Sequence, residues 1–180
     1  NQVYFMEQHL LIVLFVVLEF SQLVELPREK TVIVSGPRAS SPSNFNVFVT
    51  TWRDPNRGIQ QLMLEPLWTM EPARGEVINS LAVEGPIYND NFTKMTVNLR
   101  KGCYWSDGVE ITADDIVYGI ETTMKIPGMA YSDQFKLYID RVYKTDNYTV
   151  VFELKEPNSR FHSNFLDRWG AWRPFPKHIF

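Results

Sequence analysis

The 180-residue chain contains a single cysteine, Cys103. One thiol cannot form a disulfide within the chain, and it excludes a zinc site built from several thiolates. The chain also lacks an excess of positive charge, since 18 Lys and Arg face 21 Asp and Glu for a formal net charge of −3. A protein that binds nucleic acid needs a basic surface to meet the phosphates. We therefore expect no nucleic-acid partner.

The N-terminal stretch lacks Lys and Arg altogether from Asn1 to Pro27. Its apolar run, Leu10–Leu18, is too short to cross a bilayer, which takes about 20 apolar residues. The run does suit the apolar middle of a secretory signal peptide, about 7–15 residues long. However, no Lys or Arg precedes it, and no Ala-x-Ala cleavage site follows. Residues 1–30 are therefore either a signal peptide or leader, or they contain a buried strand or helix.

Recognisable catalytic motifs are also missing. His9, His162 and His178 are far apart and have no cysteine partner, so no metal site is indicated. The chain has no Gly-x-Ser-x-Gly elbow and no phosphate-binding Gly-Lys-Ser/Thr loop. The acidic pair Asp114-Asp115 is explained by helix capping, because acids in a first turn complement the helix dipole. Taken alone, the residues indicate neither an enzyme nor a cofactor.

The first half of the chain predicts three elements. The β-branched run Thr31–Ser35 predicts a buried strand, and the Ser-, Pro- and Asn-rich residues 37–48 predict a surface loop. Asp54 as N-cap and Pro55 at the first helical position predict a helix that ends at Pro66.

The second half shows clearer periodicity. Apolar and polar residues alternate over Thr93–Leu99 and Thr149–Leu154, which predicts two half-buried antiparallel strands. Between them, Thr112 as N-cap and Asp115 three residues later form a capping box that opens a helix. Pro127 ends this helix. The pattern predicts a mixed α/β or α+β domain.

Five segments of the chain carry a recognisable set of motifs: Glu65–Leu67, Leu99–Gly108, Thr112–Val117, Tyr148–Leu154 and Pro176–Ile179. Together they resemble one protein family, the extracellular solute-binding proteins of ABC importers, family 5, of the oligopeptide/dipeptide type. The signature of this family is a strand that ends in Leu-Arg-Lys-Gly, followed by aromatic-Ser-Asp-Gly and then by Thr-Ala-Asp-Asp at the start of a helix. Cys103 departs from it, because an aliphatic residue is usual there. We expect these residues to be scaffold.

The resemblance implies the N-terminal part of a periplasmic-binding-protein-like type II fold. Members of the family are much longer and bind solute between two lobes. Residues 31–48 would be the first strand and loop of lobe one, 49–170 the family's extra subdomain, and 171–180 the return toward lobe one. The second lobe is expected to be absent from this chain.

The solute is left open between an oligopeptide and an oligosaccharide. The segment Ser40–Asn46 resembles a loop of family members that bind oligosaccharides, whose hydroxyls and amides suit sugar hydroxyl groups. Arg38 departs from that subgroup, and Arg38 or Arg173 could instead hold a peptide carboxylate. The tryptophans could stack on sugar rings or pack in the core. The candidate ligand-binding residues are Arg38, Ser41, Asn44, Phe45, Asn46, Trp52, Trp169 and Trp172.

The function that the resemblance implies is a non-enzymatic substrate-binding component of a bacterial ABC importer. It would act as a monomer in the periplasm or outside the cell, associated with the membrane through the permease to which it delivers solute. Two alternatives remain. One is a secreted hydrolase, for which Glu65, Glu71 and Asp107 are the candidate carboxylates. The other is a truncated paralogue that binds nothing.

Overall fold

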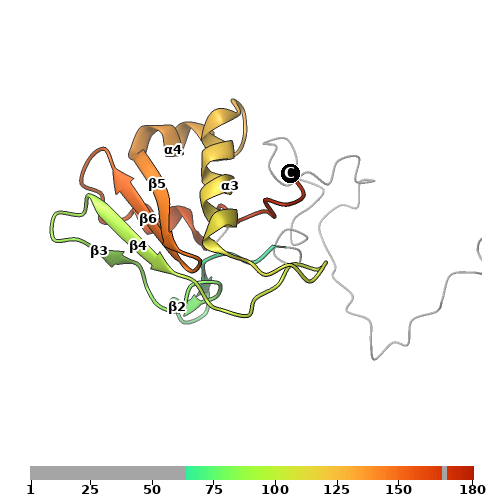
Figure 1. Cartoon of the computed structure of the whole chain (residues 1–180). Helices are drawn as coiled ribbons and strands as arrows, with labels where there is room; N and C mark the ends of the chain where they lie inside the picture. Colours follow the sequence, from blue (N-terminus) through green and yellow to red (C-terminus); the bar gives the residue numbers. More distant parts are fainter. Residues whose placement is uncertain (1–63, 168–169) are drawn as a thin grey trace, which may run out of the picture. The chain divides into compact units, whose positions relative to one another are not determined.

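The computed structural model describes residues 64–167 and 170–180 (Figure 1). These residues all belong to one compact unit of the chain, Arg38–Phe180. The predicted leader, the strand at Thr31–Ser35, the loop 37–48 and most of the helix starting at Asp54 lie outside the described residues. The last predicted helical positions, 64–66, are described and are not helical, so the helix does not reach Pro66 as predicted.

A four-stranded antiparallel sheet is the largest element of the fold (Figure 1). Its order is β3-β4-β6-β5, so the two strands predicted from alternation, β4 and β6, are neighbours at its centre. Their register places Met95 opposite Phe152, and both side chains are fully buried. The strands are β3 (Ile87–Tyr88), β4 (Lys94–Asn98), β5 (Ile139–Asp146) and β6 (Thr149–Leu154).

The half-buried character of β6 is only partly confirmed, because Val151 is buried too, at 5% exposure. Alternation places Val151 on the face opposite Val150 and Phe152. There it lies directly opposite Thr96 on β4 and Tyr143 on β5. Directly opposed residues of antiparallel strands share a face, so these two side chains cover Val151.

A second, three-stranded sheet has the order β2-β1-β7. Strands β1 (Trp68–Glu71) and β2 (Glu76–Asn79) form an antiparallel hairpin, and β7 (Leu166–Asp167) pairs with β1 in parallel. Strand β2 is exposed along its length. The hairpin turn ends at Gly75, whose φ of 70° lies in the left-handed region where glycine carries no side-chain strain.

Two helices pack beside the larger sheet: α3 (Ala113–Lys125) against β5 and β6, and α4 (Ser132–Tyr138) against α3 and β5 (Figure 1). The predicted helix is confirmed, because α3 begins directly after Thr112. It ends with Ile126 as C-cap, one residue before Pro127.

The buried face of α3 differs slightly from the predicted stripe. Ile116 and Ile120 are fully buried as expected, whereas Val117 and Met124 are only partly buried. The buried face includes Gly119, where an added Cβ would lie 2.7 Å from Cζ2 of Trp172. A glycine is therefore required at this helix position because the indole occupies the space of a side chain.

An aromatic cluster forms the centre of the core. Neighbouring ring centroids lie 5.3–6.1 Å apart in stacked, tilted and edge-on arrangements. Such pairs add to the stabilisation that apolar burial supplies. The cluster joins α4, β6, the short 3-10 helix η3 (Phe161–Asn164) and the C-terminal segment. Its members are Phe135, Phe152, Phe161, Phe165 and Trp172.

One polar link joins β3 to η3 beside this core. The backbone N–H of His162 donates to the Tyr88 hydroxyl oxygen at 3.0 Å, and that hydroxyl lies 3.1 Å from Nδ1 of His162. Burial lowers the pKa of His162 and raises the pKa of Tyr88. Both shifts favour the neutral forms of the two side chains.

Among the described residues, no helix has the length and apolar character needed to cross a bilayer.

Candidate functional site

The signature residues 105–115 form a tight turn followed by the start of α3. Gly108 N–H donates to Trp105 O at 3.0 Å, and Trp105 N–H donates to Val109 O at 2.8 Å. Asp107 Oδ1 accepts the Val109 N–H at 3.1 Å. Gly108 has a φ of 88°, which a side chain would strain. The Ser-Asp-Gly part of the motif is therefore explained by turn geometry.

The residues that cap helix α3 follow the turn in the chain. Asp115 is 4% exposed, and its Oδ2 accepts the backbone N–H of Thr112 at 2.9 Å. This bond is the acidic half of the predicted capping box, which is confirmed. The carboxylate also lies in the first turn of α3, where it complements the helix dipole.

Residues 176–179 complete this arrangement, which we call the signature corner (residues 105–115 and 176–179). Lys177 N–H donates to the second oxygen of Asp115, Oδ1, at 2.9 Å. His178 Nε2 lies 2.6 Å from Asp107 Oδ2, and this hydrogen bond holds the pKa of the Asp107 carboxyl below its ordinary value. Two aspartates thus join residues 105–115 to residues 176–179.

Asp114, next to the buried aspartate, carries an exposed charge cluster. It is hydrogen-bonded to Lys144 on β5 and lies 3.3 Å from Nζ of Lys177. The Lys144 contact, followed by that with Lys177, holds the pKa of Asp114 below its ordinary value. These bonds make the signature corner a structural junction, as the scaffold interpretation expected.

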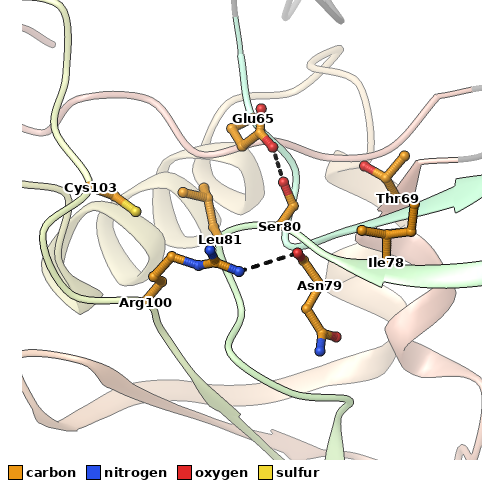
Figure 2. A pocket seen from close by; sticks show the side chains of 8 residues that line it. All are labelled: Glu65, Thr69, Ile78, Asn79, Ser80, Leu81, Arg100 and Cys103. Atoms are coloured by element: carbon orange, nitrogen blue, oxygen red, sulfur yellow. Dashed lines mark hydrogen bonds between the residues drawn. The ribbon is translucent and has the colours of Figure 1, made fainter.

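A pocket of about 470 Å³ lies beside the β1–β2 hairpin (Figure 2). Its chemistry is mixed: a guanidinium and a thiol face apolar side chains and a carboxylate (Figure 2). Glu65 accepts a hydrogen bond from the Ser80 hydroxyl, and Arg100 Nη2 donates to Asn79 O at 3.4 Å. The lining residues are Glu65, Thr69, Ile78, Asn79, Ser80, Leu81, Arg100 and Cys103.

Residues 76–177, more than half of the chain, match the model of bacterial extracellular solute-binding proteins, family 5, in its middle region. The chain belongs to this family. The resemblance stated from its motifs is therefore confirmed.

Two curated relatives agree with this assignment. The oligopeptide-binding protein AppA of Bacillus subtilis is 31% identical over 83 residues, which are 46% of this chain and 15% of that protein. The probable peptide-binding protein YejA of Agrobacterium fabrum is 30% identical over 83 residues, 44% of this chain and 13% of its own length. The chain thus spans a small fraction of the length of these relatives.

Solved structures of the family share the fold. AppA of Bacillus subtilis in complex with a nonapeptide has a TM-score of 0.66 at 28% identity, covering 79% of this chain and 27% of that one. The periplasmic oligopeptide-binding protein of Thermotoga maritima with bound mannohexaose has a TM-score of 0.56 at 31% identity, and the match covers 66% of this chain and 21% of that one. The predicted fold class, mixed α/β and similar to part of a periplasmic binding protein, is confirmed.

Most of the candidate ligand-binding residues of this family member lie outside the described residues. One described candidate is Trp172, which is 2% exposed and whose Nε1–H donates to Thr123 Oγ1 at 3.0 Å. An indole enclosed by the core has no face to offer a sugar, so the structure corrects this candidate in favour of core packing. The candidates outside the described residues are Arg38, Ser41, Asn44, Phe45, Asn46, Trp52 and Trp169.

Arg173, the alternative partner for a peptide carboxylate, is also buried, at 1% exposure. Its Nη2 is hydrogen-bonded to Asp167, and its Nη1 donates to Ala171 O at 3.3 Å. The guanidinium already has a carboxylate, and breaking a buried pair is costly. The structure therefore corrects this expectation, because Arg173 holds the C-terminal segment against β7.

The carboxylates named for a hydrolase each have a separate partner. Glu65 is bonded to Ser80, Glu71 lies 3.7 Å from Arg74 within the hairpin, and Asp107 is bonded to His178. In the part of the chain that the structure describes, no group of three or more His, Cys, Asp or Glu side chains could hold a metal ion.

Sequence reasoning missed the pocket beside the hairpin. In the sequence, Arg100 and Cys103 stand out only as members of the family signature. Ser80 lies 15 positions from its partner Glu65. No motif connects these residues, because the fold brings them together through the β1–β2 hairpin and the loop after β4.

Proposed function

We propose that this chain is part of the substrate-binding component of an ABC importer, which captures an oligopeptide or oligosaccharide outside the cytoplasmic membrane and delivers it to a permease. The observation that carries the proposal is the family match over residues 76–177. The relatives are named as binding proteins, which favours a receptor over a hydrolase. We further propose that it acts as a monomer that docks on its permease.

Two relatives with different ligands keep both a peptide and a sugar as candidate ligand classes. AppA of Bacillus subtilis is in complex with a nonapeptide, and the Thermotoga maritima protein holds mannohexaose. We propose that the segment 40–46 contributes to the choice, since its Asn44 and Asn46 amides would hydrogen-bond sugar hydroxyl groups. Arg38 would favour a peptide carboxylate instead.

Calorimetry on the complete gene product tests this proposal, with a nonapeptide library and mannohexaose as probes. Binding of either, with the ligand recovered unchanged by mass spectrometry, is the expected result. If the sugar binds, Asn44→Ala and Asn46→Ala should each weaken it about 2- to 10-fold, the loss of roughly one hydrogen bond. Asn91→Ala, in an exposed turn, is the matched control. Cleavage of the probes, or no binding of either class, would refute the proposal.

Localisation outside the cytoplasm depends on the apolar run Leu10–Leu18. If this run is a secretory signal, changing Val13 and Val16 to Asp should abolish export of a reporter fusion, because charge opposes membrane entry. Gln22→Asp lies outside the run and should leave export unchanged. Equal export of all three fusions would show that the run is not a signal.

A further inference from the structure

Arg100, an exposed residue, contributes a guanidinium with few partners to the pocket beside the β1–β2 hairpin. Arg100 N–H donates to Leu81 O at 2.7 Å, which fixes the backbone. Among the described residues, the guanidinium makes one hydrogen bond, to Asn79 O at the long distance of 3.4 Å. A guanidinium has five N–H donors and suits a carboxylate bidentately. Arg100 can therefore accept an anion without losing an existing ion pair.

One wall of the pocket is apolar and is exposed to solvent. Ile78 on β2 is 51% exposed, although it lines the pocket together with Leu81 and the half-buried Cys103 (Figure 2). Covering such a side chain removes apolar surface from water, which is favourable. The wall therefore suits an aliphatic group, and the volume lies within the usual range for small-molecule sites.

The far rim limits the charge of a ligand. Glu65 lies across the pocket from Arg100, hydrogen-bonded to Ser80 (Figure 2). Its negative charge opposes a second carboxylate but tolerates an amide or an ammonium. One cationic side and one anionic side thus favour a ligand with a single carboxylate.

We propose that this pocket binds a small monocarboxylate with an aliphatic side chain, in which Arg100 holds the carboxylate and Ile78 and Leu81 contact the side chain. A free apolar amino acid and the C-terminal residue of a short peptide share this chemistry. Occupancy of the pocket does not depend on which solute the importer carries, and it can be measured on this chain.

Cys103 provides a site-specific assay because it is the single cysteine of the chain and lines the pocket. Its alkylation by iodoacetamide is followed by mass spectrometry with and without N-acetyl-L-leucine. Only the empty pocket reacts, so a probe at nine times its dissociation constant should slow alkylation about tenfold. N-acetyl-L-leucinamide, which lacks the carboxylate, should give no protection. Calorimetric titration with the same two probes measures binding independently of thiol reactivity.

Two neighbouring substitutions distinguish binding in the pocket from a general effect of positive charge. Arg100→Met should abolish both protection and binding heat. Lys101→Met removes the same charge one residue later, where Nζ lies 5.2 Å from the ring of Tyr148 and does not line the pocket, and it should behave like the wild type. L-leucine and glycyl-L-leucine distinguish the two sources: protection by both assigns the site to the shared carboxylate and side chain, and protection by the dipeptide alone assigns it to a peptide terminus.

Three results would overturn the proposal: no binding heat with N-acetyl-L-leucine, equal binding of its amide, or equal loss in the Arg100 and Lys101 variants. None of them bears on solute binding by the complete gene product, which is measured with the nonapeptide library and mannohexaose. Failure of the pocket and failure of the importer proposal are therefore distinguishable.

Discussion

Replacement of Asp115 by Ala tests the signature corner most directly. The carboxylate is buried, and each of its oxygens accepts one backbone N–H at 2.9 Å: that of Thr112 and that of Lys177. The substitution therefore removes the acidic half of the capping box and the bond to the C-terminal segment at once, without adding bulk.

The expected loss follows from these two bonds. A hydrogen bond to a charged group contributes about 1.5–3 kcal/mol. The Thr112 N–H is half-buried, whereas Lys177 is exposed, so water can replace part of the second bond. We expect Asp115→Ala to lower the free energy of unfolding by about 2–4 kcal/mol, and Asp115→Asn, which keeps one acceptor oxygen, by about 1–2 kcal/mol.

The neighbouring Asp114 is the matched control. It is also an aspartate and lies in the same helix turn, but its partners, Lys144 and Lys177, are exposed. Exposed ion pairs contribute about 0–1 kcal/mol, so Asp114→Ala should cost no more than that.

Urea denaturation followed by tryptophan fluorescence measures these differences. The Asp115→Ala midpoint should fall by about 1–2 M at an unchanged slope. Equal midpoints for the Asp115 and Asp114 variants would refute the reasoning, because they would show that burial and the two backbone bonds make no difference.

Three other features give predictions of their own. Tyr88→Phe should lower stability by about 1–2 kcal/mol in thermal unfolding, since it removes the hydroxyl that His162 contacts, and an unchanged Tm would contradict this link. Because burial lowers the pKa of His162, the unfolded chain binds a proton at this residue more readily than the folded chain does. The free energy of unfolding that is present above about pH 6.5 should therefore be lost as the pH falls. His162→Gln should flatten this pH dependence in denaturation measured at about pH 5–7.5. Gly119→Ala should cost about 1–3 kcal/mol through the clash with Trp172, whereas Gly85→Ala, with no atom within 4 Å, should be nearly neutral; equal midpoints would reject the clash.

Elements with a local signal could be predicted from the sequence. Strand β4 and helix α3 follow from alternation, a capping box and a terminating proline, all of which act over a few residues. The parallel pairing of β1 with β7 carries no such signal, since it depends on where the intervening chain returns. The short helix α4 is formed within the aromatic cluster, with Phe135 fully buried. Tertiary packing rather than propensity stabilises such a short helix.

The site shows the same division. Asp107 and Asp115 could be interpreted as turn and cap residues because their partners are close in the chain, yet their second bonds reach residues 176–179. Trp172 could not be assigned, because its burial depends on the glycine at position 119 of a distant helix. The pocket around Arg100 had no sequence signal, since Arg100 and Glu65 line it from positions far apart in the chain.

The signature corner also sets an order for folding. The bond between Asp115 and Thr112 spans 3 positions and can form as soon as the first turn of α3 does. The bonds to Lys177 and His178 span 62 and 71 positions, so they require closure of a long loop and form after the sheet and helices have assembled. We therefore expect the two oxygens of Asp115 to act at different stages of folding: one when the first turn of α3 forms, and the other when the last segment docks and is held in place.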